Sequence, residues 1–238
     1  MRTISTSSSV LAFWADLVFL EAALLADEET VSLAVPITGA LAQFTDILTV
    51  DLNTRRAVLQ AAARGSVADT KLDGGLRSLF SGTLHLVEQD RKRVQFSTIF
   101  PENIGRMVRH ALKRQVEVAV DIASKLALKI YPEAFRDERL GLLQPLIDKG
   151  KAVLDEQRAA EIARVDGRLD VQAWKKDVNA VRDSVYGELV TLGASTGRKK
   201  AWADTFFPGP KTEKASAEAD EDAGDDDPNG GLGGEDGG

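Results

Sequence analysis

Two clusters of basic side chains are the residues of this sequence best suited to binding an anion. The stretch RKRVQFSTIFP starts at Arg91 and RKKAWADTFFP starts at Arg198, and 5 of their 11 positions are identical. Arginine and lysine side chains bind phosphate and carboxylate groups through charge-assisted hydrogen bonds. The candidate contacts for an anion or a partner are therefore Arg91, Lys92, Arg93, Arg198, Lys199 and Lys200.

The same clusters also have a structural interpretation. Each is expected at or just beyond the end of a helix, where a cation complements the negative end of the helix dipole by about 0.3–1 kcal/mol. The aromatic residues that follow would pack the returning chain onto the helices, and the proline would end it. We favour this interpretation, and two anion sites are the alternative.

The charge of the chain is unevenly distributed. Its net charge is −7, but residues 209–238 contain ten acidic residues and two lysines, a net of −8, which leaves +1 for residues 1–208. A nearly neutral body with two small basic clusters argues against general affinity for nucleic acid.

Catalytic signatures are missing from the sequence. The chain has no cysteine and two histidines, His85 and His110, neither of which follows a glutamate at the Glu-x-x-His spacing of di-iron bundles. Asp16, Glu21 and Asp121 are acids within apolar segments, and they would form a carboxylate site only if they converged on a cavity. We expect no enzymatic activity, no cofactor and no metal.

Apolar residues recur at helical spacing along the chain, which predicts an all-α fold. Helices are expected near residues 8–26, 38–64, 67–90, 102–130, 138–165 and 169–193, with Pro145 kinking the fifth or delaying its start. The apolar run Val10–Ala26 is expected to be the most buried helix. Asp16 and Glu21 argue against the alternatives, a targeting segment or a membrane span.

The two halves of the chain share a pattern. Gly39–Gly65 aligns with Gly141–Gly167 at a shift of 102 residues with 8 of 27 positions identical, and the basic stretches align at a shift of 107. This self-similarity predicts a tandem duplication. Residues 1–101 and 102–208 would each form a three-helix unit, packed as a six-helix bundle or as two abutting bundles. Gly65 and Gly167 are expected to be helix C-caps.

Residues 209–238 are expected to form a disordered acidic tail, because they have high charge, much glycine and almost no large apolar side chain. Within this tail, DDDPNGGLGGED resembles a calcium-binding EF-hand loop, with Asp225, Asp227 and Asn229 at the first three ligand positions. The twelfth residue is Asp236 instead of the usual glutamate. The resemblance covers 12 of 238 residues and does not indicate membership of a family.

These observations favour a cytoplasmic, non-enzymatic scaffold or adaptor that binds a protein partner, with the acidic tail serving solubility or a basic partner. The alternative is an anion- or nucleic-acid-binding module that uses the two basic clusters, with the acidic tail as an internal competitor. A homo-oligomer is compatible with either hypothesis. The scaffold hypothesis predicts an exposed apolar surface on the body of the protein.

Overall fold

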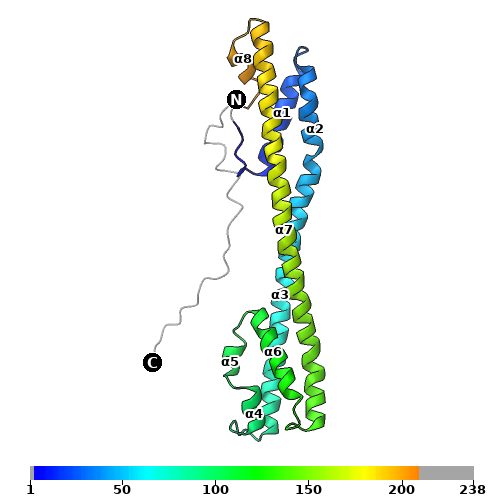
Figure 1. Cartoon of the computed structure of the whole chain (residues 1–238), viewed down its shortest axis with the longest axis vertical. Helices are drawn as coiled ribbons and strands as arrows, with labels where there is room; N and C mark the ends of the chain where they lie inside the picture. Colours follow the sequence, from blue (N-terminus) through cyan, green and yellow to red (C-terminus); the bar gives the residue numbers. More distant parts are fainter. Residues whose placement is uncertain (1–2, 209–238) are drawn as a thin grey trace, which may run out of the picture. The chain divides into compact units, whose positions relative to one another are not determined.

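The computed structural model describes residues 3–208, and every element in this range is a helix (Figure 1). No strand occurs among these residues, which confirms the predicted all-α class. The chain divides into two compact units. Among the described residues, unit 1 comprises 3–42 with 177–208, and unit 2 comprises Gln43–Lys176. Helix α7, Glu133–Ser195, contributes to both units.

Unit 1 is built on α1, Val10–Leu25, and α2, Ala34–Ala42, with the 3-10 helix η1, Val31–Leu33, between them. Helix α1 begins where the hydroxyl of Ser9 accepts a hydrogen bond from the amide of Ala12, an N-cap. The end of α7 and the short helix α8, Lys200–Asp204, complete the unit. Its apolar core includes Phe13, Leu17, Leu20, Leu24, Ile37, Val185 and Leu189.

Unit 2 contains α3, Phe44–Leu86, α4, Val94–Ile99, α5, Ile104–Met107, α6, Leu112–Leu126, and the first part of α7. Helices α3 and α7 run antiparallel in this unit. Arg164 lies 2.7 Å from Asp51 and Arg64 lies 3.0 Å from Glu156, so residue numbers rise along one helix as they fall along the other. The core of unit 2 includes Leu72, Leu76, Leu79, Ile99, Ala119, Ile122, Leu126, Leu143, Ile147 and Val153.

The prediction of helix ends at Gly65 and Gly167 is wrong. The segments expected at 38–64 and 67–90 share the continuous helix α3, and those expected at 138–165 and 169–193 share α7. A Cβ atom at Gly167 would lie 3.1 Å from Thr54 Cγ2, and one at Gly65 would overlap the side chain of Gln157. Glycine at these positions therefore permits close approach of the opposite helix.

Two other local predictions also differ from the structure. The helix expected at 102–130 is interrupted between α5 and α6, where the buried Gln115 side chain donates hydrogen bonds to the carbonyls of Val108 (3.2 Å) and His110 (2.8 Å). These bonds satisfy backbone groups that a helix would otherwise pair. Pro145 does not delay the fifth helix, because α7 continues through it while Leu143 and Ile147 on either side are buried.

The predicted disordered tail lies outside the described residues, and so does its EF-hand-like stretch, Asp225–Asp236. Within the described range, the helical stretch Val31–Leu86 includes an 18-residue window with mean hydropathy 1.4, of which 17% is buried. By length and composition alone such a stretch could cross a membrane, which is weak support for a span. The expectation of no membrane span stays a prediction.

Replacing glycines inside α7 distinguishes close packing from capping. We expect Gly141→Ala to raise the free energy of unfolding by about 0.5–1 kcal/mol, because a Cβ there meets no atom within 4 Å and alanine favours a helix. Gly167→Ala should gain less, because its Cβ crowds Thr54 and Val50. Urea unfolding followed by circular dichroism measures both. A loss for Gly141→Ala would contradict the continuous helix.

The buried carboxylate of Asp51 should make unit 2 sensitive to acid. Burial raises the pKa of Asp51, but hydrogen bonds from Arg164 and Arg55 outweigh it and hold the pKa below 3.8. A carboxyl with a lowered pKa stabilises the fold above 3.8 and loses that contribution as pH falls through its folded value. We expect Asp51→Asn to cost about 1.5–3 kcal/mol at pH 7. The difference from wild type should shrink at pH 3, as measured by urea unfolding, and a constant difference would contradict this account.

Candidate functional site

The first basic cluster belongs to unit 2 and is held by neighbouring side chains. Arg93 lies 2.9 Å from the carboxylate of Glu88 and 3.9 Å from that of Asp90. The guanidinium of Arg91 lies 5.6 Å from the centre of the Phe80 ring, and Lys92 is exposed. Part of the positive charge of this cluster is therefore already neutralised within the loop that carries it.

The second basic cluster belongs to unit 1 and is also engaged. Arg198 lies 2.9 Å from Glu29 and 3.8 Å from Asp27, and its guanidinium stacks 4.5 Å from the centre of the Trp202 ring. Lys199 is the N-cap residue of α8 and Lys200 is its first residue. The cluster thus joins the chain after α7 to the loop after α1.

Both basic clusters begin beyond the end of a helix, as expected, and their effect on the helix dipole stays a prediction. Helix α3 ends at Leu86 and α7 at Ser195, before either cluster begins, and the clusters lead into α4 and α8. The expected aromatic anchoring is confirmed by burial of four of the five aromatic residues, Phe96, Phe100, Phe206 and Phe207, while Trp202 is half-buried.

The acids singled out from the sequence do not form one site in either unit. Asp16 and Glu21 belong to unit 1 and Asp121 to unit 2, where it pairs with Lys125 at 2.7 Å. His85 lies in the last turn of α3, and His110 lies between α5 and α6. Among residues 3–208, no group of three or more His, Asp or Glu side chains is arranged to hold a metal ion.

Asp16 forms a buried ion pair that the sequence did not reveal. Its carboxylate lies 2.7 Å from Arg182 Nε and accepts a 3.2 Å hydrogen bond from Nη2, while the Arg182 side chain is only 2% exposed. The guanidinium also lies 5.5 Å from the centre of the Phe207 ring. Burial raises the pKa of Asp16, and the charge and hydrogen bond of Arg182 offset this in part. The pair ties α1 to α7 and to the chain after α8.

Helix α1 carries two apolar seams, each with the 3-4-3-4 spacing of a heptad pattern. The inner seam is buried, with exposed fractions of 0–7%, and consists of Val10, Phe13, Leu17, Leu20 and Leu24. The outer seam is shifted by one residue and consists of Leu11, Trp14, Val18, Glu21 and Leu25, whose four apolar members are 38–56% exposed. A second seam at this spacing matches the contact surface of a further helix.

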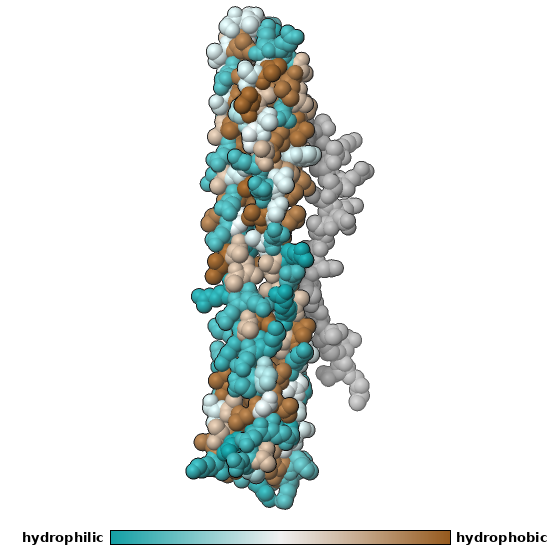
Figure 2. Space-filling view, turned by 90° about the vertical axis from the view of Figure 1, so that its right-hand side faces the viewer, coloured by the Kyte–Doolittle hydropathy of each residue, from teal (hydrophilic) through white to brown (hydrophobic). Residues whose placement is uncertain are grey.

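The outer seam continues onto neighbouring residues of unit 1. The hydroxyl of Thr38 in α2 donates a hydrogen bond to Glu21, and Val31 and Val35 nearby in sequence are exposed. Phe19 on α1 is exposed as well. Figure 2 shows apolar residues gathered in the part of the molecule where Figure 1 places α1 and α2.

The charged side chains that residues 3–42 contribute to unit 1 are all acidic. Residues 3–42 contain no lysine or arginine but five acidic residues, Asp16, Glu21, Asp27, Glu28 and Glu29. Arg182 pairs with Asp16, and Arg198 pairs with Asp27 and Glu29. Glu21 is the only charged position of the outer seam, where it is half-buried.

The expectation that Val10–Ala26 is the most buried helix is only half right, because the outer seam is exposed. The sequence does indicate the outer seam. Helix α1 has apolar residues at two sets of heptad positions, whereas a single buried seam would need only one set. Arg182 was also detectable. It lies within the apolar stripe of Val178, Val181 and Val185, where a cation needs a buried acid as partner.

Comparison with known proteins gives no further guide: no family model, no curated protein and no solved structure matches this chain.

Removing one member of the buried ion pair should destabilise unit 1 strongly. We expect Arg182→Met to lower the free energy of unfolding by about 3 kcal/mol at pH 7, because it leaves the Asp16 carboxylate buried without its cation. A raised folded pKa makes the charged form unfavourable. The loss should therefore shrink as pH falls below the pKa that Asp16 has in the variant.

The double variant Asp16→Asn with Arg182→Met should recover part of this loss. Urea unfolding at pH 7 and pH 4 measures each variant, with exposed Arg168→Met as a control expected to stay within about 0.5 kcal/mol of wild type. An equal loss for the single and double variants would mean that the two side chains act independently.

Proposed function

We propose that this protein is a non-enzymatic adaptor that binds a helix of a partner protein along the outer seam of α1. The observation that carries the proposal is the exposure of Leu11, Trp14, Val18 and Leu25 at heptad spacing on a helix whose inner seam is already buried. Contiguous exposed apolar surface of this kind marks interaction sites in soluble proteins.

The spacing of the seam favours a helical partner. Alternating steps of three and four residues place side chains along one line of the helix, where they interlock with a second helix by knobs-into-holes packing. An amphipathic helix that lays its apolar face on a matching surface is a common mode of peptide recognition. Trp14 lies within the seam and is of the residue type most often responsible for binding energy at interfaces.

The charge of the seam favours a partner with a basic residue. Glu21 occupies one seam position, where a polar group sets register and partner choice, so a lysine or arginine opposite it would be matched. A lipid surface is less suitable. Amphipathic helices that lie on membranes carry lysine and arginine against anionic lipid, and residues 3–42 carry none.

The alternative, an anion- or nucleic-acid-binding module, is less well supported. Arg93 and Arg198, one from each basic cluster, are both paired with carboxylates, which reduces the charge available for phosphate. A role for the acidic tail in solubility or in binding a basic partner, and a cytoplasmic location, stay predictions.

We also propose that residues 1–101 and 102–208 arose by tandem duplication. Gly65 and Gly167 are matched in the sequence and both lie where the opposite helix packs closely. The two basic clusters each lead into a short helix, α4 or α8. Unit 1 combines α1 and α2, from the first repeat, with the end of α7 and α8, from the second repeat. Two repeats that exchanged their terminal helices would give this composition.

The adaptor proposal is tested with designed peptides of three heptads, with leucine along the seam and either lysine or glutamate at the position opposite Glu21. We expect the lysine peptide to bind the full chain more tightly in isothermal titration calorimetry. Trp14→Ala should weaken binding by at least about 30-fold, because a central aromatic anchor is typically worth 2 kcal/mol or more. Glu21→Lys should reverse the preference to the glutamate peptide.

Leu59→Gln is the matched control, because Leu59 is 71% exposed but belongs to unit 2, and it should leave binding unchanged. Equal losses for Trp14→Ala and Leu59→Gln would contradict the assignment of the seam. Sedimentation that showed a dimer broken by Trp14→Ala would assign the seam to a second copy of the chain. If the wild-type chain bound neutral lipid vesicles and Trp14→Ala abolished that binding, the outer seam would be assigned to a membrane.

A further inference from the structure

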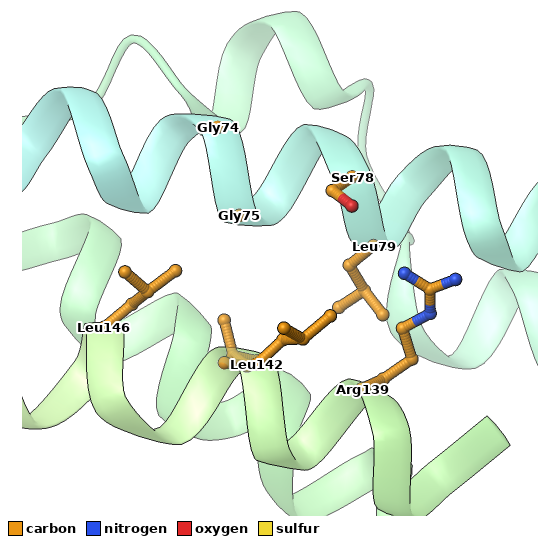
Figure 3. A pocket seen from close by; sticks show the side chains of 8 residues that line it. Gly74, Gly75, Ser78, Leu79, Arg139, Leu142 and Leu146 are labelled. Atoms are coloured by element: carbon orange, nitrogen blue, oxygen red, sulfur yellow. The ribbon is translucent and has the colours of Figure 1, made fainter. Parts of the chain in front are cut away.

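Unit 2 contains a cavity of about 360 Å³ between α3 and α7, which is within the size range of small-molecule sites. Figure 3 shows that the cavity has two different ends. Ser78 and the guanidinium of Arg139 lie at one end, and Leu146 faces Gly75 at the other. The complete lining is Gly74, Gly75, Ser78, Leu79, Arg139, Leu142, Leu143 and Leu146.

Glycines on α3 let side chains of α7 approach that helix closely at both ends of the cavity. A Cβ atom at Gly75 would overlap Leu146 Cδ1, whereas one at Gly74 would meet no atom within 4 Å. A Cβ atom at Gly82 would lie 2.7 Å from Arg139 Nη2 and 2.8 Å from its Cζ. The glycine at position 82 therefore leaves room for the guanidinium, and Gly75 lets Leu146 approach α3 at the apolar end.

Arg139 has hydrogen-bonding capacity that the described residues do not use. Its side chain is 19% exposed, its guanidinium stacks 5.4 Å from the centre of the Phe135 ring, and Nη2 lies 3.5 Å from Glu138 Oε1. The Nε atom is buried, and no described residue accepts a hydrogen bond from it. The hydrogen bonding of this guanidinium within the described residues is therefore incomplete, at the end of the cavity where Figure 3 shows it.

We propose that the cavity binds an aliphatic monocarboxylate. The carboxylate pairs with the guanidinium of Arg139 at the polar end of the cavity, through the charge-assisted hydrogen bonds that arginine makes with carboxylates. The hydrocarbon chain lies along Leu142, Leu143 and Leu146 toward Gly75. One cation lines the cavity and the remaining lining is mostly apolar, so the ligand has one negative charge and an apolar body.

The proposal is tested by titrating the full chain with octanoate and, in parallel, with octanol, which has the same chain length without the charge. Isothermal titration calorimetry and the chemical shifts of leucine methyl groups report the binding. We expect octanoate to bind at least about tenfold more tightly than octanol, because a hydrogen bond to a charged group is worth that much. Butyrate, with the same head group and a short chain, should bind more weakly than octanoate.

Variants of the polar end locate the site. Arg139→Gln should weaken octanoate binding by about tenfold to a hundredfold and leave octanol binding unchanged. Gly82→Ala should weaken it as well, because the added Cβ displaces the guanidinium. Glu138→Gln should tighten it by removing a competing carboxylate. Gly141→Ala is the matched glycine control on α7 and should have no effect, since its Cβ meets no atom within 4 Å.

Three results would overturn the proposal: no octanoate binding at millimolar concentration, equal binding of octanoate and octanol, or unchanged octanoate binding in both Arg139→Gln and Gly82→Ala. The first two use the wild-type chain and do not depend on any variant folding. Circular dichroism of each variant separates loss of the site from loss of the fold. Trp14→Ala should leave octanoate binding intact, which keeps this test independent of the adaptor proposal.

Discussion

Burial in these helical units is limited to one stripe on most helices, and this limit explains much of the surface. Helix α3 buries Leu72, Leu76 and Leu79 but leaves Leu52, Leu59 and Val67 exposed along its length. With few helices in each unit, apolar residues outside the stripe have no neighbour to pack against. On α3 these residues are seven and eight positions apart, two turns of helix between each, and single exposed apolar side chains are ordinary in proteins. On α1 they fall on a second heptad line, which is why we assign partner binding to that helix.

Polar interactions fix how the stripes are matched. Hydrophobic burial is not directional, so it specifies which faces are covered more than which residues meet. The Asp16–Arg182 pair in unit 1 and the Asp51–Arg164 pair in unit 2 each join helices far apart in sequence at a single register. A shift of one helix along the other would leave a buried charge unpaired. For a fully buried pair this costs about 3–5 kcal/mol.

The fold class could be predicted from the sequence because helical periodicity is local, whereas the ends of the long helices depended on distant contacts. Gly65 and Gly167 fit helix caps by composition, but their role depends on Gln157 and on Thr54 in the opposite helix. The partner of Asp16 lies 166 residues away in the chain, a separation that no local pattern covers. The cavity beside Arg139 could not be predicted for the same reason, because its lining comes from two helices far apart in the sequence. The outer seam differs in this respect, since its heptad spacing is a local pattern that is present in the sequence.

The absence of lysine and arginine between Arg2 and Arg55 has a practical consequence for handling this protein. Trypsin cleaves only after basic residues, so it releases α1 and α2 together in one peptide that ends at Arg55. Reagents that modify lysine side chains leave the whole outer seam untouched. The chain can therefore be labelled or immobilised through its lysines with this surface intact, which makes it a convenient bait for a helical partner.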